Sequence, residues 1–291
     1  MTENPLLRRG AVAEGAKMMW TETGELTTDL ADFVRRDYRF NGVSKPVLQT
    51  GLSGPAIIVI HEIFGFTPAL ARLCRWLCDA GFSVHAPILI GKPDASNDEA
   101  LRPSRILSLC ISREFNLFAE NRASPIVDWL KPLARQLHQE FGGPGVGVIG
   151  MCLTGGFALN MAVDGSVVAP VLAQPSLPVG KAAGLDVSPQ EVAAVQARVA
   201  QEGLSVRGFR FEGDLSCQAP RFERLQALLG DGFLGVVLPD AAANPNGMKA
   251  KGRPPHSVFT GDLIDAPDQL TRQAVDDLIA FYRARLLSQP G

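Results

Sequence analysis

Short runs of apolar residues alternate along this chain with longer segments in which apolar residues recur every three or four positions. The first run, 56–60, is apolar at every position, which is typical of a parallel strand covered on both faces. A helix is predicted at 67–80, ended by Gly81, and a strand at 82–89. This order of strand, helix and strand is the unit from which parallel sheets are built.

The same alternation continues to the end of the chain. Helices are predicted at 125–141, 153–163, 188–203, 219–229 and 266–287, and strands at 146–150, 167–173, 205–211 and 233–238. Ser124 and Ser188 are each followed by proline, the pattern of an N-cap residue with proline at the first helical position. We therefore expect an α/β fold, a doubly wound and mostly parallel sheet flanked by helices in a single domain.

The chain contains no repeat, low-complexity tract or linker that would divide this domain. Residues 1–54 are mixed in pattern, and we expect them to pack on the sheet or to extend it, ahead of an α/β domain over 55–291. Two stretches do not fit the alternation. The segment 91–122 is less regular, and 240–265 is expected to form a long loop rich in glycine and proline.

The composition indicates a globular protein. Of the 291 residues, 46% are hydrophobic, which is enough for a core that needs no disulfide or metal. The formal net charge of -2 provides no general attraction to nucleic acid or to an anionic membrane. The five cysteines are scattered and odd in number, and residues 1–10 lack the apolar centre of a signal peptide. We therefore expect free thiols and a cytoplasmic protein.

The segment 142–163 carries no charged residue and is long enough to cross a bilayer. Its many glycines and Pro144 interrupt any continuous apolar helix, so a buried strand, a tight turn and a buried helix are the preferred interpretation. The glycines at 145, 147 and 150 also match a dinucleotide-binding fingerprint. In that fingerprint the glycines follow the strand, whereas here they lie within it, so we expect neither a membrane span nor a nucleotide cofactor.

The strongest chemical signal is the stretch 150–156, Gly-Met-Cys-Leu-Thr-Gly-Gly, between a predicted buried strand and a predicted helix. This is the context of a nucleophile elbow, a strained turn that exposes a nucleophile at the sheet edge, here Cys152. Small flanking residues let the two backbones approach, and a helix N-terminus favours the thiolate. The alternative is an ordinary buried cysteine, which is how we interpret Cys74, Cys78 and Cys110. Cys217 lies closer to the expected catalytic loop, and we expect it in the core or at the rim of the site, with a place in the site lining as the alternative.

A thiol nucleophile requires a base, and the base requires an acid that orients it. In α/β-hydrolases the nucleophile, the acid and the histidine follow one another along the chain, and only His256 satisfies that order. Asp214, at the end of a predicted strand, is the expected acid, and Asp240 is the alternative. The other three histidines are expected to lie in the core (His85), at the surface (His138) and at a strand end next to Glu62 (His61).

The stretch 59–65, Val-Ile-His-Glu-Ile-Phe-Gly, combined with the cysteine elbow, resembles the dienelactone hydrolase family of α/β-hydrolases over roughly 50–288. The resemblance implies a triad of Cys152, Asp214 and His256 that hydrolyses small esters or lactones. It also implies that Glu62 interacts with the resting thiol and helps to control when the thiolate forms. The family usually has G-x-C-x-G-G, whereas here Thr154 precedes the glycine pair, and we expect a slightly altered elbow.

We therefore expect a hydrolase that forms a thioacyl intermediate at Cys152, with the N–H groups of Ile63 and Leu153 as the oxyanion hole. Arg113 is the candidate for binding a substrate carboxylate, and an ordinary surface arginine is the alternative there. No cofactor or metal is implied, the partner is a small ester or lactone, and the protein is expected to be a monomer or a homodimer. The alternative function is a catalytically silent α/β-hydrolase-fold binding protein.

Overall fold

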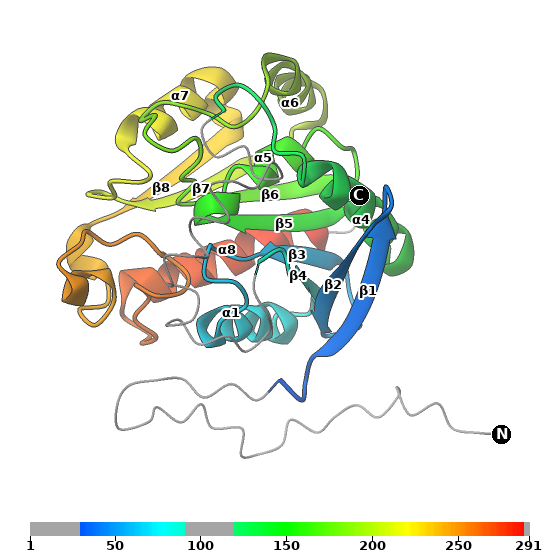
Figure 1. The fold of residues 1–291 in the computed structure, drawn as a ribbon, viewed down its shortest axis with the longest axis horizontal. Coiled ribbons are helices and arrows are strands. Elements are labelled where there is room, and N and C mark those ends of the chain that lie inside the picture. Colours follow the sequence, from blue (N-terminus) through cyan, green and yellow to red (C-terminus); the bar gives the residue numbers. More distant parts are fainter. Residues whose placement is uncertain (1–29, 91–118, 288–291) are drawn as a thin grey trace.

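The computed structural model of this chain describes residues 30–90 and 119–287 (Figure 1). Its centre is an eight-stranded sheet with the strand order β1-β2-β4-β3-β5-β6-β7-β8. Six strands, β3 to β8, run parallel, whereas β1 and β2 are antiparallel to each other and β2 is antiparallel to β4. The strands are β1 (Val34–Phe40), β2 (Val43–Thr50), β3 (Ala56–Ile60), β4 (Ser83–Pro87), β5 (Val146–Met151), β6 (Val167–Ala173), β7 (Val206–Phe211) and β8 (Phe233–Leu238).

Helices cover both faces of this sheet. The α-helices are α1 (Pro68–Asp79), α4 (Val127–Phe141), α5 (Phe157–Met161), α6 (Pro189–Glu202), α7 (Ala219–Leu229) and α8 (Leu270–Leu286). Short 3₁₀ helices lie at η2 (Cys152–Thr154), η3 (Gly230–Gly232), η4 (Asp240–Ala242) and η5 (Met248–Lys251). None of the helices in the described ranges is both long and apolar enough to cross a bilayer.

The core consists of two apolar clusters separated by the sheet. Successive residues of β3 alternate between them: Ile58 packs with α4, α5, α6 and α7, and Ile57 packs with α1 and α8. This strand is buried at all of its positions because both of its faces are covered. The predicted doubly wound, mostly parallel sheet is confirmed, and it has the carboxyl ends of its parallel strands at one edge (Figure 1).

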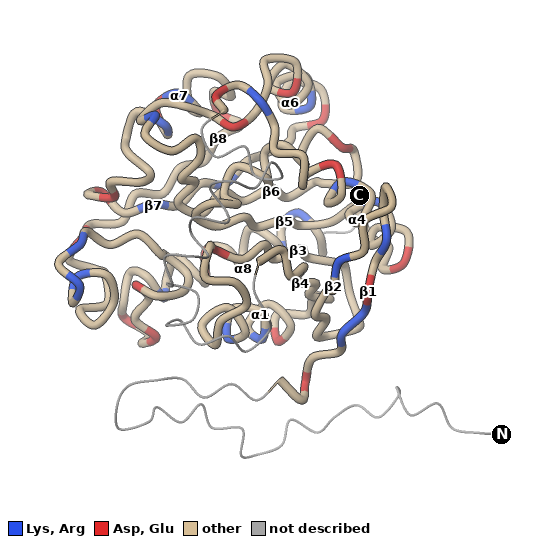
Figure 2. The backbone as a smooth tube through the Cα atoms, in the orientation of Figure 1, with Lys and Arg blue, Asp and Glu red and all other residues tan. Residues whose placement is uncertain are grey.

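Positions of Lys, Arg, Asp and Glu are spread along the described backbone, with both signs of charge in most regions (Figure 2). The antiparallel pair β1 and β2 extends the sheet, and the hydrophobic pattern did not predict these two strands. In β1 only Tyr38 is buried, and Arg35, Arg36 and Asp37 are exposed, so the strand lacks the apolar alternation of a half-buried strand. It is held by pairing with β2 rather than by its own apolar face.

Elements near the elbow also differ in detail from the sequence pattern. The helix predicted at 153–163 is the shorter α5, preceded by the 3₁₀ turn η2, and the closing helix begins at Leu270 rather than at 266. His85 is buried in β4 as predicted, where Gln49 and Ser83 bond its two ring nitrogens and burial lowers its pKa to about 3. His138, predicted at the surface, is half-buried against the carbonyl of Gly143.

Candidate active site

Cys152 occupies the turn that connects β5 to α5. Its φ of 56° is in the left-handed region, which is sterically unfavourable for a residue with a Cβ and is a mark of a nucleophile elbow. The flanking glycines are required by close approaches. A Cβ at Gly150 would lie 2.1 Å from the carbonyl oxygen of Thr154, and a Cβ at Gly155 would lie 2.5 Å from Cα of Pro175.

Thr154, the residue that departs from the usual family spacing, fastens this turn to the neighbouring strand. Its buried hydroxyl accepts a hydrogen bond from the Met151 N–H at 3.1 Å. The same hydroxyl lies 3.1 Å from the carbonyl oxygens of Ile60 and His61, at the end of β3, and can donate its single proton to one of them at a time. A threonine at this position therefore joins the turn that carries Cys152 to the strand end that carries Ile63.

Asp214 and His256 form a buried pair beside the elbow. His256 Nδ1 lies 2.7 Å from Asp214 Oδ2, and Asp214 Oδ1 accepts hydrogen bonds from the N–H groups of Ser216 (2.8 Å) and Cys217 (3.1 Å). Only 3% of Asp214 and 9% of His256 is exposed, so solvent screens the pair little. These contacts fix both the carboxylate and the imidazole in place.

The electrostatics of His256 favour its protonated form. Burial lowers the pKa of His256, but Cys152 and the hydrogen-bonded Asp214 carboxylate raise it by more, and the net pKa lies well above its ordinary value. The second ring nitrogen, Nε2, is buried and makes no hydrogen bond of regular geometry within the described part of the chain. An imidazole oriented by a carboxylate on one side, with a thiol as its neighbour, is equipped to exchange a proton with that thiol.

Two further aspartates position the loops that carry this pair. Asp262 Oδ2 accepts hydrogen bonds from the N–H groups of His256 (2.8 Å) and Ser257 (3.0 Å). Asp262 therefore fixes the backbone of the loop that carries His256. Asp240, the alternative acid, instead accepts a hydrogen bond from the N–H of Gly213 at 2.8 Å. Of the two candidate acids, Asp214 is the one that the structure places against His256.

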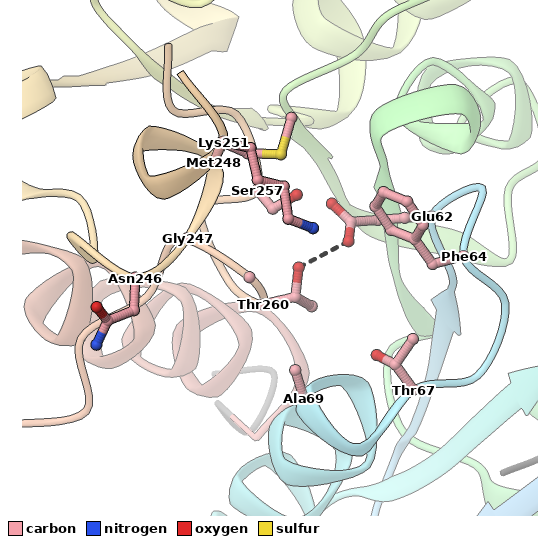
Figure 3. Close-up of a pocket in the computed structure, with 11 residues that line it drawn as sticks. Glu62, Phe64, Thr67, Ala69, Asn246, Gly247, Met248, Lys251, Ser257 and Thr260 are labelled. Atoms are coloured by element: carbon pink, nitrogen blue, oxygen red, sulfur yellow. Dashed lines mark hydrogen bonds between the residues drawn. The ribbon is translucent and has the colours of Figure 1, made fainter. Parts of the chain in front are cut away.

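The Glu62 carboxylate is buried, and its two hydrogen-bond donors are uncharged. Gln174 Nε2 donates to Oε1 at 2.9 Å, and Thr260 Oγ1 donates to Oε2 at 2.7 Å (Figure 3). The expected contact between Glu62 and the resting thiol is not present in this arrangement. The sequence also allowed a second interpretation, an ion pair between Glu62 and a neighbouring arginine such as Arg72 or Arg75, and no such pair is found among the described residues. Arg72 pairs instead with Asp265 and Arg75 with Asp32.

The thiol has a different neighbour, on the short segment 174–176 that follows β6. Cys152 Sγ lies 3.6 Å from Ser176 Oγ, and the Ser176 N–H donates to the Cys152 carbonyl at 2.9 Å. Gln174, two residues earlier, has a φ of 35° and reaches both Glu62 and the N–H of Val258. This segment thus touches the elbow, the buried carboxylate and the histidine loop.

Glu62 also lines a cavity of about 140 Å³, whose lining residues are drawn in Figure 3. Its walls include Glu62 and Ser257, which are adjacent in sequence to Ile63 and His256. The remaining lining residues are Phe64, Thr67, Ala69, Asn246, Gly247, Met248, Lys251, Thr260 and Gly261. Within residues 30–90 and 119–287, no group of three or more potential metal ligands comes together.

The N–H groups of Ile63 and Leu153, the candidate oxyanion hole, belong to the turns after β3 and β5. Neither N–H takes part in the hydrogen bonds that close the described turns, and their role as an oxyanion hole stays a prediction. Arg113, the candidate for binding a substrate carboxylate, lies outside the described residues, as does Cys110. The arrangement combines a strained thiol with an oriented imidazole, which suits attack on a carbonyl carbon.

Residues 44–205 match the model of the dienelactone hydrolase family, which covers more than half of the chain. The chain belongs to this family.

Among curated proteins, members of this family are similar to the chain over part of their length. Carboxymethylenebutenolidase 1 of Cupriavidus pinatubonensis is 30% identical over 113 residues, and carboxymethylenebutenolidase of a Pseudomonas species is 31% identical over 114 residues. Each match covers 38% of this chain and 46% of the relative, so the similarity spans less than half of the curated relatives.

Solved structures of the family share the fold over almost their whole length. A putative dienelactone hydrolase from Klebsiella pneumoniae superimposes with a TM-score of 0.57 at 17% identity, covering 88% of this chain and 99% of that one. A dienelactone hydrolase-like promiscuous phosphotriesterase from metagenomic libraries gives 0.59 at 19% identity, covering 85% and 97%. At these identities the likeness shows the α/β-hydrolase fold of the dienelactone hydrolases.

Sequence reasoning missed three residues that organise the site of this dienelactone hydrolase family member. They are Gln174, Ser176 and Asp262, which contact Glu62, the Cys152 thiol and the His256 loop. The first two belong to a polar stretch directly after a buried strand, and Asp262 lies in the loop that carries the histidine. Position at a strand end was the signal available for Gln174 and Ser176.

Proposed function

We propose that this protein hydrolyses small carboxylic esters or lactones through a triad of Cys152, His256 and Asp214. The observation that carries the proposal is the buried pair of His256 and Asp214, with its 2.7 Å hydrogen bond, beside a cysteine in a left-handed turn. Membership of the dienelactone hydrolase family supports an ester or lactone as substrate. The carboxymethylenebutenolidase names of the curated relatives agree with this class.

In the proposed reaction, His256 Nε2 takes the thiol proton and Cys152 Sγ forms a bond to the carbonyl carbon of the substrate. The carbonyl oxygen becomes an oxyanion, which accepts hydrogen bonds from the N–H groups of Ile63 and Leu153. When the tetrahedral intermediate collapses, the C–O bond breaks and His256 returns the proton to the leaving alkoxide. Asp214 orients and stabilises the imidazolium throughout because its carboxyl group is bonded to Nδ1.

The thioester left on Cys152 is then cleaved by water. His256 removes a proton from the water, the hydroxide adds to the acyl carbon, and the sulfur departs as a thiolate that regains the proton. A lactone follows the same steps, except that its leaving alcohol stays attached to the acyl group. The neighbouring cavity of about 140 Å³ is lined by neither Cys152 nor His256, so the small substrate is proposed from the family alone.

Glu62 is proposed to act on the thiol rather than on the substrate carbonyl. Its carboxylate lies in the wall of the cavity, and two uncharged donors hold it there. A substrate that enters the cavity meets this carboxylate, and the resulting change in its hydrogen bonds alters the field at Cys152. This role of Glu62 differs from the roles of the triad residues. Glu62 would control when the Cys152 thiolate forms, whereas the triad carries out the reaction.

The test uses p-nitrophenyl acetate with the wild-type protein, Cys152→Ala and the control Cys78→Ala. Cys152→Ala is expected to lose on the order of 10⁴-fold in turnover, because the nucleophile of a triad is removed. Intact mass after mixing is expected to show an acetyl adduct in the wild type and in Cys78→Ala only, since Cys78 lies on α1. Wild-type turnover in a folded Cys152→Ala protein would remove the proposed mechanism.

A further inference from the structure

One of the side chains next to the Cys152 sulfur carries a hydroxyl group, and His256 is another neighbour. Ser176 Oγ lies 3.6 Å from Cys152 Sγ, within the range of a hydrogen bond that involves sulfur. Both residues are half-buried, so the contact is shielded in part from water. A sulfur that loses its proton can only accept hydrogen bonds, and a serine hydroxyl has one proton to donate.

The Ser176 hydroxyl is held in register with the sulfur by its own backbone. The Ser176 N–H donates to the carbonyl of Cys152 at 2.9 Å, so the two residues are tied together through backbone and side chain. The preceding residue, Pro175, packs against Gly155, and its carbonyl accepts a hydrogen bond from the guanidinium of Arg221.

Arg221 makes this attachment rigid. Its buried guanidinium also donates to the carbonyls of Gly184 (2.9 Å) and Ser216 (3.0 Å), so the segment before Ser176 is bonded to two other loops. Because the backbone is fixed on both sides, the hydroxyl needs only a side-chain rotation to point at the sulfur. Little conformational entropy is then lost when the hydrogen bond forms.

Several titratable or charged side chains lie around the Cys152 thiol. Ser176, which touches the sulfur, is uncharged. His256 approaches from the loop after β8, with Asp214 behind it, and Cys217 lies within electrostatic reach. On the segment 174–176, Gln174 bonds to Glu62, and the carbonyl of Pro175 accepts a hydrogen bond from Arg221. Asp186 lies against Gly156, at the start of α5.

We propose that Ser176 is a further catalytic residue, whose hydroxyl donates a hydrogen bond to the Cys152 sulfur and stabilises the thiolate that attacks the substrate. The inference rests on the proposed function of Cys152 as the nucleophile. No bond is made or broken at Ser176: its proton stays on Oγ, and the thiol proton still goes to His256 Nε2. The imidazolium and the hydroxyl then stabilise the same negative charge from two different loops.

The experiment measures iodoacetamide alkylation across pH, with the label assigned to Cys152 by peptide mass. It compares the full-length wild type, Ser176→Ala, Ser176→Thr and the control Ser166→Ala, which removes a hydroxyl at the opposite end of β6. Burial raises the pKa of the Cys217 thiol to about 12 and that of the Cys74 thiol further, so these two contribute little background. Circular dichroism confirms that each variant is folded.

Ser176→Ala is expected to move the midpoint of Cys152 alkylation upward by about one pH unit, the value of one modest hydrogen bond to a charged group. Below the midpoint this corresponds to about tenfold slower alkylation. Ser176→Thr keeps a hydroxyl and is expected to stay near the wild type, as is Ser166→Ala. A profile of Ser176→Ala that superimposes on the wild type would overturn the proposal, as would an equal shift in Ser166→Ala.

These outcomes are independent of the test of the proposed function. If Cys152 is not the nucleophile, Cys152→Ala keeps its esterase activity whatever the alkylation profiles show. If Cys152 is the nucleophile but Ser176 does not act on it, Cys152→Ala is inactive and the Ser176→Ala profile is unchanged. The acidic limb of kcat/KM for p-nitrophenyl acetate is expected to move with the alkylation midpoint, which a merely structural role of Ser176 would not produce.

Discussion

Asp186 gives this protein a pH dependence of stability that can be tested by a single substitution. The side chain is 4% exposed, and it packs so close to Gly156 that a Cβ there would lie 1.8 Å from Oδ1. Its Oδ2 atom has no hydrogen-bond partner within the described part of the chain. Burial raises the pKa of Asp186 from 3.8 to about 7, although a backbone hydrogen bond and the positive charge of Arg221 act in the opposite direction.

The direction of this pH dependence follows from which state of the protein, folded or unfolded, binds the Asp186 proton more tightly. The unfolded chain releases the proton near pH 3.8, whereas the folded protein keeps it up to about pH 7. The stability that this proton contributes is therefore fully present below pH 3.8 and is lost as the pH rises to about 7. At 1.36 kcal/mol per pH unit, the loss over this interval is about 4 kcal/mol.

Asp186→Asn removes the titration and keeps the size of the side chain. We expect the free energy of unfolding of the variant, relative to the wild type, to rise by about 4 kcal/mol between pH 4 and pH 8. Urea denaturation followed by circular dichroism at four pH values in this range measures the difference, and other groups cancel because both proteins contain them. Asp231→Asn, at an exposed position in η3, is the matched control. Parallel pH dependences of wild type and Asp186→Asn would refute the reasoning.

Three further substitutions test the site. Asp214→Asn is expected to lower kcat by roughly 10⁴-fold, as loss of the orienting acid does in a comparable triad, whereas Asp240→Asn should change it little; the opposite ranking in ester hydrolysis would place the acid on the other loop. Thr154→Val leaves a buried backbone N–H without an acceptor and is expected to lower the free energy of unfolding by about 1–3 kcal/mol, with Thr154→Ser close to the wild type in urea denaturation. Glu62→Gln is expected to change the pH profile of iodoacetamide labelling at Cys152 with only a small loss of stability, and superimposable profiles would assign Glu62 a structural role alone.

The parts of the fold with strong local patterns could be predicted from the sequence. The all-apolar run at 56–60 is a central strand because both faces are covered, and proline after a serine cap marks the start of α6. Strand β1 could not be predicted in this way, since it buries Tyr38 alone and depends on its partner strand. Tertiary pairing, which the local pattern does not encode, determines such an edge.

In the candidate site, too, the residues in locally patterned segments could be predicted from the sequence, and the residues that depend on tertiary contacts could not. Cys152 could be proposed because the elbow is a local structure with its own glycine spacing, and the order of residues along the chain pointed to His256. Asp214 was expected from its place at the end of a strand, with Asp240 as the alternative. Ser176 and Asp262 act through contacts between loops that are distant in sequence, Cys152 with Ser176 and His256 with Asp262. No periodicity or spacing predicts which hydroxyl or carboxylate meets a given loop, so these residues became visible only in three dimensions.

Because the backbone of Cys152 is left-handed, thermal stability and the proposed catalytic activity favour different residues at this position. A residue with a Cβ at a φ of 56° is strained, and glycine relieves that strain, although it also removes the packing of the Cys152 side chain on the core. Laboratory evolution that selects for heat resistance alone is therefore expected to enrich glycine or asparagine at residue 152 and to produce sturdier but inactive proteins. Selection for turnover must accompany any effort to make this scaffold more heat-resistant.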